Sequence, residues 1–135
     1  MRPENKTGSE PWPRCSFFGI FDGHGGNSCA DFLRDRLHTF VVAESTFPED
    51  PKEAIKIGFE KAEEEWTSKH ALSGSVADGN EQIVDRSGSC AIVILIIDEM
   101  CYVANVGDSR AILSGESGSR IFPLSRDHKP TDPHE

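Results

Sequence analysis

Long hydrophobic runs are absent from this sequence. The longest, residues 91–97, has the length of one β-strand and falls well short of the roughly 20 apolar residues that a membrane-spanning helix needs. The first residues also lack the apolar stretch of a secretory signal. We therefore expect an intracellular protein, cytoplasmic or nuclear, that has no membrane partner.

Positive charge is in short supply as well. The 135 residues include 14 Lys and Arg but 23 Asp and Glu, which gives a formal net charge of −9. A nucleic-acid partner usually requires a basic face, so none is expected. The acidic surplus fits either a solvated surface or a group of carboxylates that converge on a metal ion, and composition does not separate these two readings.

Cysteine is sparse and irregularly spaced. The four cysteines form no C-x-x-C pair, so a zinc site is not expected despite the five histidines. Free thiols in a reducing compartment are the simplest account of this pattern. With 36% hydrophobic and 27% charged residues, the composition is otherwise that of one soluble globular domain.

Two amphipathic helices are predicted in the first half of the chain. The first begins after residue 26, where Asn27 or Ser28 can serve as its N-cap. The second has Asp50 at the N-cap, Pro51 at the first helical position and Glu53 three residues after the cap. Each N-cap is followed by apolar residues at helical spacing, so each helix should bury one face.

Strands are predicted before and after these helices. Residues 15–21 form a short apolar run that we expect to be a buried strand. Residues 89–97 are almost continuously apolar, which indicates a strand buried on both faces. A turn at 98–99 should lead into 100–106 as an antiparallel hairpin, and residues 110–113 should resume as strand.

The remaining segments are predicted to lack regular structure. Residues 1–14 should be an irregular leader, and residues 68–88, which are polar and small, should be a flexible loop. The resulting order is a strand, two helices and then a run of antiparallel strands. This order differs from an alternating βαβ pattern and indicates an α+β fold with an antiparallel sheet.

The segment D-G-H-G-G, at residues 22–26, is the strongest candidate for chemistry. A buried strand would deliver the Asp22 carboxylate to its end, where the Gly23 carbonyl is also exposed, and both are hard oxygen ligands of the kind that Mg²⁺ or Mn²⁺ prefers. His24 could donate a proton near neutral pH. Taken alone, the segment also fits an ordinary glycine-rich turn, whereas the glycine spacing does not match the G-x-G-x-x-G fingerprint of a dinucleotide site.

Four segments, in order along the chain, resemble one family. Residues 17–26 (F-F-G-I-F-D-G-H-G-G) are similar to the F-F-G-V-F-D-G-H-G-G signature of PP2C-type metal-dependent serine/threonine phosphatases. Residues 87–91 resemble that family's S-G-S-T-A segment, with Cys90 in place of threonine. Residues 104–111 match A-N-V-G-D-S-R-A, and residues 125–130 resemble S-x-D-H-K-P.

The resemblance implies a fold and a reaction. The fold would be an antiparallel β-sandwich flanked by helices, in αββα order. Two Mn²⁺ or Mg²⁺ ions would activate a water that hydrolyses phosphoserine or phosphothreonine in protein substrates, without a phosphoenzyme. Asp22 would bridge the ions, the Gly23 carbonyl would bind one of them, and His24 would protonate the leaving oxygen. Asp108 would bind a weaker third ion, although an aspartate in such a turn could simply accept backbone hydrogen bonds.

The resemblance also predicts that the site is incomplete. The family carries an arginine and an M-E-D segment upstream, and further aspartates in D-G and D-N motifs downstream, that this sequence does not contain. We therefore expect residues 1–135 to be a partial phosphatase domain, a truncated piece of a longer enzyme. The alternative is an inactive regulatory or binding module that self-associates or pairs with a partner through uncovered sheet edges. The resemblance leaves Arg110 as a structural ion-pair partner, with His128 and Lys129 holding a loop in place.

Overall fold

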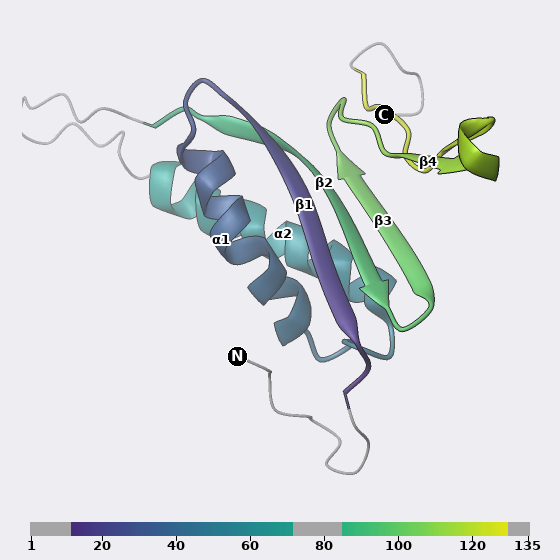
Figure 1. Ribbon diagram of the computed structural model, residues 1–135. Coiled ribbons are helices and arrows are strands. Elements are labelled where there is room, and N and C mark those ends of the chain that lie inside the picture. The colour runs from purple at the N-terminus through teal and green to yellow at the C-terminus, as the bar shows by residue number, and fades with distance from the viewer. Residues whose placement is uncertain (1–11, 72–84, 130–135) are drawn as a thin grey trace, which may run out of the picture. The chain divides into compact units, whose positions relative to one another are not determined.

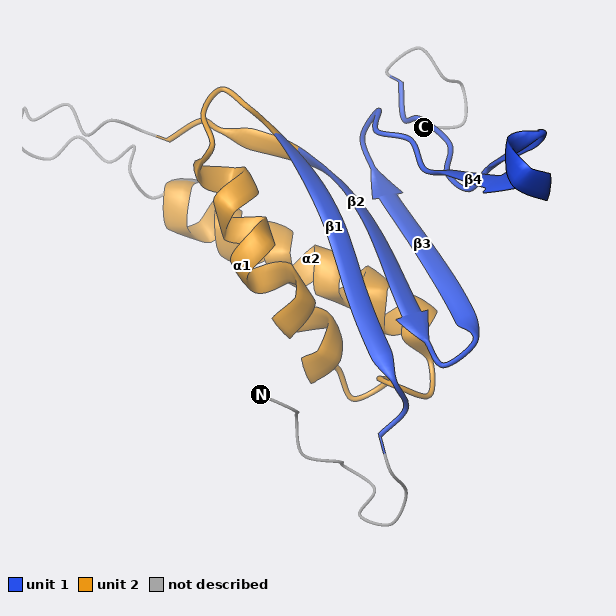
Figure 2. Cartoon of the chain, in the orientation of Figure 1, with its two compact units in different colours: residues 1–22, 90–135 blue, residues 23–89 orange. Residues whose placement is uncertain are grey.

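The computed structural model describes residues 12–71 and 85–129 (Figure 1). Most of the predicted leader and most of the predicted 68–88 loop therefore lie outside the described residues. Where the loop can be checked, its start is wrong, because the second helix continues to Ala71. The described chain forms two compact units, one made of residues 1–22 and 90–135 and the other of residues 23–89 (Figure 2).

The first unit contains most of a three-stranded sheet in the order β1-β2-β3, formed by β1 (Cys15–His24), β2 (Gly88–Ile97) and β3 (Met100–Val106). β2 and β3 pair antiparallel, with Ile97 opposite Met100, so the predicted hairpin and its turn are confirmed. Asp98 in this turn has a φ of 50°, and its carboxylate accepts a hydrogen bond of 3.0 Å from the backbone N–H of Arg14. The start of β1 is thereby tied to the hairpin turn.

Burial differs sharply between the two faces of this sheet. Val93 and Leu95 of β2 are only 0% and 1% exposed, in agreement with the predicted burial of this strand. The predicted burial of β1 is wrong, because Phe18 is 58% and Ile20 is 69% exposed. Alternate residues of a strand point to opposite faces, so Phe18 and Ile20 share a face that the described residues leave open.

A second, two-stranded sheet follows in the same unit. β4 (Ile112–Gly115) pairs antiparallel with β5 (Arg120–Pro123), and the 3-10 turn η2 (Glu116–Gly118) joins them. The strand predicted at 110–113 starts later than expected, because the Ala111 N–H donates to the side chain of Ser125 rather than to a strand partner. Strand β5 was not predicted from the sequence. Within residues 12–71 and 85–129 the chain is α+β with two helices and antiparallel sheets, which agrees with the predicted fold class and with a partial PP2C-like fold.

The second unit contains the two predicted helices, α1 (Ser28–Ala43) and α2 (Pro51–Ala71). At the start of α2, the Glu53 N–H donates to the Asp50 carboxylate at 3.2 Å, which confirms the predicted cap. In the part of the chain that the structure describes, no helix is both long and apolar enough to cross a membrane.

The predicted N-cap position of α1 is confirmed, but its side chain does not cap the helix. Asn27 occupies the N-cap position but makes no capping hydrogen bond with its side chain. Instead, the N–H of Cys29 donates to the hydroxyl of Ser87, which lies 58 positions along the chain, at 3.1 Å. A helix leaves its first N–H groups without partners, so a hydroxyl supplied by a distant segment performs the same task as a local cap.

Loss of this distant cap should be measurable. Ser87 is only 5% exposed, and Ser87→Ala would leave the Cys29 N–H without its acceptor. We expect the free energy of unfolding to fall by about 0.5–2 kcal/mol, the usual range for removal of a helix cap. Urea denaturation measures this change. The control Ser68→Ala, on the exposed surface of α2, should change stability by less than about 0.5 kcal/mol, and equal effects of the two variants would contradict the capping role.

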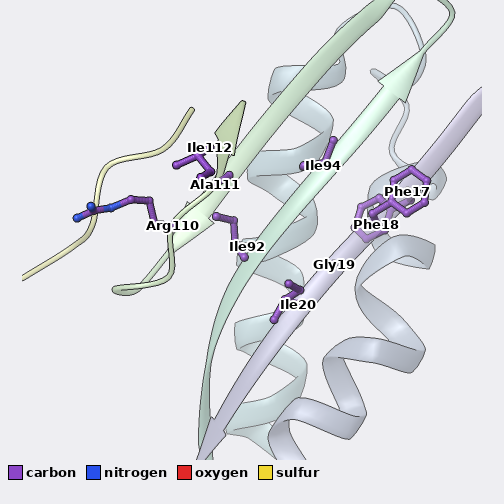
Figure 3. A pocket seen from close by; sticks show the side chains of 9 residues that line it. All are labelled: Phe17, Phe18, Gly19, Ile20, Ile92, Ile94, Arg110, Ala111 and Ile112. Atoms are coloured by element: carbon purple, nitrogen blue, oxygen red, sulfur yellow. The ribbon is translucent and has the colours of Figure 1, made fainter. Parts of the chain in front are cut away.

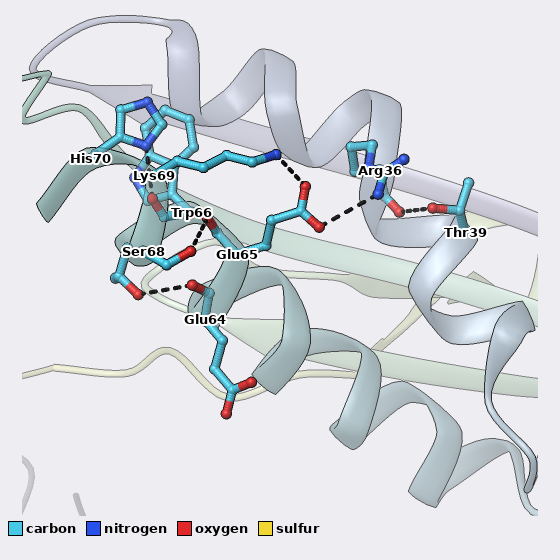
Figure 4. Close-up of polar contacts among 9 residues, drawn as sticks. Arg36, Thr39, Glu64, Glu65, Trp66, Ser68, Lys69 and His70 are labelled. Atoms are coloured by element: carbon cyan, nitrogen blue, oxygen red, sulfur yellow. Dashed lines mark hydrogen bonds and ion pairs between the residues drawn. The ribbon is translucent and has the colours of Figure 1, made fainter. Parts of the chain in front are cut away.

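The helices meet through close backbone contact and a surface network. A side chain at Gly58 of α2 would come within 3.1 Å of the backbone of Val41 in α1, so the helices approach where glycine provides room. On the outer side, the carboxylate of Glu65 pairs with Arg36 of α1 at 3.4 Å and with Lys69 at 2.5 Å (Figure 4). Exposed pairs of this kind contribute little stability, so the buried contact at Gly58 is the stronger determinant of the helix pair.

Candidate metal and phosphate site

The predicted chemical segment begins at the end of β1, where the sequence analysis expected it. Asp22, Gly23 and His24 are the last three residues of β1, and all three are exposed. Among the described residues, no hydrogen-bond donor or cation contacts the Asp22 carboxylate. Both of its oxygens therefore remain available to a ligand.

The glycines after β1 allow this segment to lie against the start of β2. Gly25 and Gly26 have φ angles of +67° and +137°, which residues with a side chain rarely adopt. A Cβ at Gly25 would lie 3.3 Å from the Arg86 carbonyl oxygen, and one at Gly26 would lie 3.2 Å from the Ser87 Cβ. The structure thus brings together two motifs that are far apart in sequence, D-G-H-G-G and S-G-S-C-A.

The imidazole of His24 lies directly over Gly88. A Cβ built on Gly88 would stand 2.5 Å from Nε2 of His24 and 2.9 Å from its Cε1. Real Cβ atoms do not approach other atoms this closely, so any residue other than glycine at position 88 would displace the ring. Gly88 therefore helps to determine where the imidazole can lie.

Asp108 lies in the turn that follows β3 and is exposed. The thiol of Cys90 donates to its Oδ1 at 3.4 Å, and Cys90 also fills the space next to Gly107, whose φ is +112°. No backbone N–H among the described residues donates to the carboxylate, so the alternative role predicted for Asp108 receives no support from its contacts. The thiol takes the place of the hydroxyl that the family's threonine would offer, as a weaker donor.

The D-H-K-P segment is bound to the same turn. Arg110 makes a bidentate ion pair with Asp127, with nitrogen–oxygen distances of 2.9 and 2.7 Å. The His128 N–H donates to the Gly107 carbonyl at 2.9 Å. Lys129 lies 3.9 Å from the Asp127 carboxylate. These contacts confirm that Arg110 is a structural ion-pair partner and that residues 128–129 help to hold the loop. The hydrogen bond from Arg110 holds the pKa of Asp127 below its usual value, against an opposing effect of burial, with Lys129 adding to the lowering.

This ion pair should make the 125–129 segment sensitive to acid. Because the pKa of Asp127 is lower in the folded chain than in the unfolded one, the pair contributes stability above the unfolded pKa and loses it as the pH falls through the folded pKa. We expect the protection of amides 125–129 from hydrogen exchange, relative to the unfolded chain at the same pH, to fall below about pH 4. Asp127→Asn should remove most of this pH dependence, and an unchanged acid response in that variant would assign the effect to another carboxylate.

The oxygen donors present match a hard divalent cation in type. Asp22 and Asp108 supply exposed carboxylates, and the Gly23 carbonyl lies beside the first of them in sequence. Within residues 12–71 and 85–129, no three His, Cys, Asp or Glu side chains gather to form a metal cluster. Mg²⁺ commonly binds through one or two protein carboxylates and keeps several waters, so each of these donors is by its chemistry a possible ligand in such a site. The roles of Asp22, Gly23, His24 and Asp108 remain predictions.

Two residues with structural importance for this region, Ser87 and Asn105, were not singled out from the sequence, and the contact of Cys90 with Asp108 was not predicted. Ser87 caps α1, Cys90 contacts Asp108, and Asn105 donates to two backbone carbonyls next to the Asp108 turn. Ser87 and Asn105 lie inside recognisable motifs, and Asn105 is a polar residue in an apolar strand. A polar residue in an apolar strand was therefore the feature that could have drawn attention to Asn105. The hydrogen-bond partners of a side chain in distant segments cannot, however, be predicted from its neighbours in sequence.

Comparison with known proteins agrees with the motifs. The sequence profile of protein phosphatase 2C matches residues 3–135. The chain is 38% identical over 129 residues to probable protein phosphatase 2C 35 of Arabidopsis thaliana, covering 93% of this chain and 34% of that protein. It is 39% identical over 129 residues to protein phosphatase 2C homolog 2 of Hypocrea jecorina, covering 95% of this chain and 26% of that protein.

A third relative gives the same picture. Probable protein phosphatase 2C T23F11.1 of Caenorhabditis elegans is 39% identical over 120 residues, which cover 88% of this chain and 30% of the relative. The chain thus spans about a third or less of the length of these curated relatives. On the match of its whole described length, the chain belongs to the protein phosphatase 2C family.

Proposed function

We propose that this chain is the part of a protein serine/threonine phosphatase that carries the leaving-group acid and part of the metal site. The observation that carries the proposal is the end of β1. There, Asp22 is exposed and its carboxylate contacts no described residue, and the ring of His24, two positions later, lies next to Gly88. Both residues lie within the family's own motif. The substrates would be phosphoserine and phosphothreonine in proteins.

In this proposal each of these residues has a separate role. Asp22 and the Gly23 carbonyl would hold Mn²⁺ or Mg²⁺, and Asp108 would hold a further, weaker ion. When bound, the metal ions would acidify water and neutralise phosphate charge. His24 would hold a proton on its imidazole and donate it to the departing serine or threonine oxygen, which as an alkoxide is a poor leaving group. The packing over Gly88 would limit the directions in which that proton can be presented.

The proposal is tested by Mn²⁺-dependent hydrolysis of a phosphothreonine peptide by the 135-residue chain, with the Asp22→Asn variant as control. Activity that is lost in the variant would support a working site in this chain. A folded chain without activity would indicate that the missing ligands belong to a longer protein, and the assay would then be repeated on that protein. A longer protein with no metal-dependent activity would refute the proposal.

A second candidate function, a regulatory or binding module, is favoured by one specific observation. The open face of the sheet unit contains an apolar cavity of about 750 Å³, lined by residues 17–20 of β1, Ile92 and Ile94 of β2, and residues 110–112 (Figure 3). Exposed apolar surfaces of this kind mark contact sites or aggregation-prone faces. The chain would then pair with a partner, or with a second copy, through this face.

Self-association through this face predicts a clear effect of added charge. Ile20→Lys should shift the chain towards monomer in sedimentation equilibrium, because burying an unpaired ammonium group in an apolar interface is costly. The control Met100→Lys adds the same charge at a residue that is 59% exposed and does not line the cavity. If the unmodified chain is monomeric at high concentration, or if both variants behave alike, self-association through this face is refuted.

The compartment also belongs to the proposal. We expect the cytosol or nucleus, since the four cysteines are free and two of them, Cys15 and Cys101, are exposed. Exposed free thiols persist best in a reducing compartment.

A further inference from the structure

Asn105 occupies an unusual position for a polar residue. It lies on β3 opposite Ile92 of β2, among apolar neighbours. Its Nδ2 donates to the Gly107 carbonyl and to the Arg126 carbonyl, both at 2.9 Å. Both partners are acceptors only, so the nitrogen rather than the oxygen of the amide must face them. A single side chain thereby joins the Asp108 turn to the D-H-K-P segment.

The Gly107 carbonyl is held from two sides. It accepts hydrogen bonds from Asn105 Nδ2 and from the His128 N–H, each of 2.9 Å. This carbonyl belongs to the peptide group that joins Gly107 to Asp108. Because a peptide group is planar, fixing its oxygen also fixes its N–H and the direction in which the Asp108 chain leaves. The left-handed φ of Gly107 and the packing of Cys90 against it restrict the same peptide from the preceding side.

The second acceptor of Asn105 is anchored independently. The Leu124 N–H donates to the Ala111 carbonyl, the Ala111 N–H donates to Ser125 Oγ, both at 2.9 Å, and Arg110 pairs with Asp127. Residues 124–128 are therefore a fixed support, and Asn105 connects the Asp108 turn to it.

The chemistry of this bridge is specific to asparagine. Two carbonyls must be reached by two N–H groups on one nitrogen at the end of a short side chain, which aspartate, serine and leucine do not offer. The Oδ1 atom of Asn105 is buried and has no partner among the described residues. A buried acceptor without a partner carries an energetic cost, so its presence indicates that the position serves geometry rather than maximal stability.

We propose that Asn105 is a positioning residue: its carboxamide holds the Gly107–Asp108 peptide in the orientation from which Asp108 binds a divalent cation. The inference rests on the proposed function, because it needs Asp108 to be a metal ligand. It adds a role for the A-N-V-G-D and D-H-K-P motifs, which together form one support for a single carboxylate.

The test is Mn²⁺ binding by the 135-residue chain, followed through the electron paramagnetic resonance signal of free Mn²⁺. Asn105→Ala should raise the Mn²⁺ dissociation constant about 10-fold or more, as is usual when a partner of a ligand is removed. Asp108→Asn measures how much the dissociation constant rises when the proposed ligand itself is lost. The matched control is Ser114→Ala, at an exposed residue of β4 that lies outside the Asp108 turn and outside residues 124–128. It should leave the dissociation constant unchanged.

A readout independent of the metal uses the same variants. Hydrogen exchange at the His128 amide, which donates to the Gly107 carbonyl, should accelerate without Mn²⁺ in Asn105→Ala and not in Ser114→Ala. If Asn105→Ala does not fold, Asn105→Ser, which keeps one shorter donor, should give a smaller weakening of Mn²⁺ binding with an unchanged circular dichroism spectrum. An unchanged dissociation constant in that folded variant would overturn the proposal.

The remaining outcomes separate this proposal from the one on which it rests. If Asp108→Asn weakens binding and Asn105→Ala does not, Asp108 is a ligand and the role of Asn105 is overturned. If Ser114→Ala weakens binding as much as Asn105→Ala, the effect is not specific to the bridge made by Asn105 and the positioning role is again overturned. If the unmodified chain binds no Mn²⁺, or Asp108→Asn changes nothing, the metal role of Asp108 fails and the positioning role fails with it.

Discussion

Replacing Asp22 by asparagine is expected to lower Mn²⁺-dependent phosphatase activity at least about 100-fold, since even residues that only support a metal ligand contribute 10–100-fold to metal affinity. The substitution keeps the size of the side chain and removes its negative charge, and asparagine offers one neutral oxygen where the carboxylate offers two charged ones. The measurement is hydrolysis of a phosphothreonine peptide as a function of Mn²⁺ concentration. It is made in a protein that supplies the remaining ligands.

The fold should not be affected by this change. Asp22 is exposed, and no described residue donates to its carboxylate, so no internal contact is lost. Asp31→Asn, at a half-exposed aspartate in the first turn of α1 that pairs with Arg34, is a control that should retain full activity. Full activity in Asp22→Asn, or an equal loss in Asp31→Asn, would contradict the assignment of Asp22 as a metal ligand.

Replacing Gly88 by alanine is expected to disable His24 without altering the histidine itself. The new Cβ would stand 2.5 Å from Nε2, so the ring must move away from its observed position. The loss should approach that of His24→Gln, about 10²–10⁴-fold for a general acid. It should be largest for alkyl phosphates such as phosphothreonine. An activated aryl phosphate needs little protonation of its leaving group, so it should be hydrolysed at a rate closer to that of the unmodified protein.

The stability of the Gly88→Ala variant distinguishes a displaced His24 ring from a general loss of structure. The clash at Gly88 involves an exposed side chain that can swing into solvent, so the free energy of unfolding should change little. Gly115→Ala, on β4, is a control in which the nearest atom, on the Phe122 ring, is 3.3 Å away from the new Cβ. Equal losses on alkyl and aryl substrates in Gly88→Ala would argue against a proton-donating role for His24.

Local sequence patterns predicted those parts of the structure that local interactions determine. The α2 cap at Asp50 and the hairpin turn at residues 98–99 depend on neighbours within a few positions, and both were predicted correctly. The placement of Asp22 at the end of a strand follows from the same kind of pattern.

Other features depend on residues distant in sequence and could not be predicted in this way. The donor at the start of α1 is satisfied by Ser87 and not by its neighbour Asn27. An apolar pattern also shows that a strand can be buried, but not that something covers it, and Phe18 is the example. The same holds for the site, in which the contact of His24 with Gly88 and the bridge made by Asn105 join segments that only the folded chain brings together.

The distant cap of α1 has a consequence for the order of folding. The Cys29 N–H and the Ser87 hydroxyl are separated by 58 positions, so the hydrogen bond between them closes a long loop that contains the whole of α2. Closing such a loop costs chain entropy before any contact repays it. The first turn of α1 is therefore expected to become protected late, after α2 has formed, even though it precedes α2 in the chain and leaves a ribosome first.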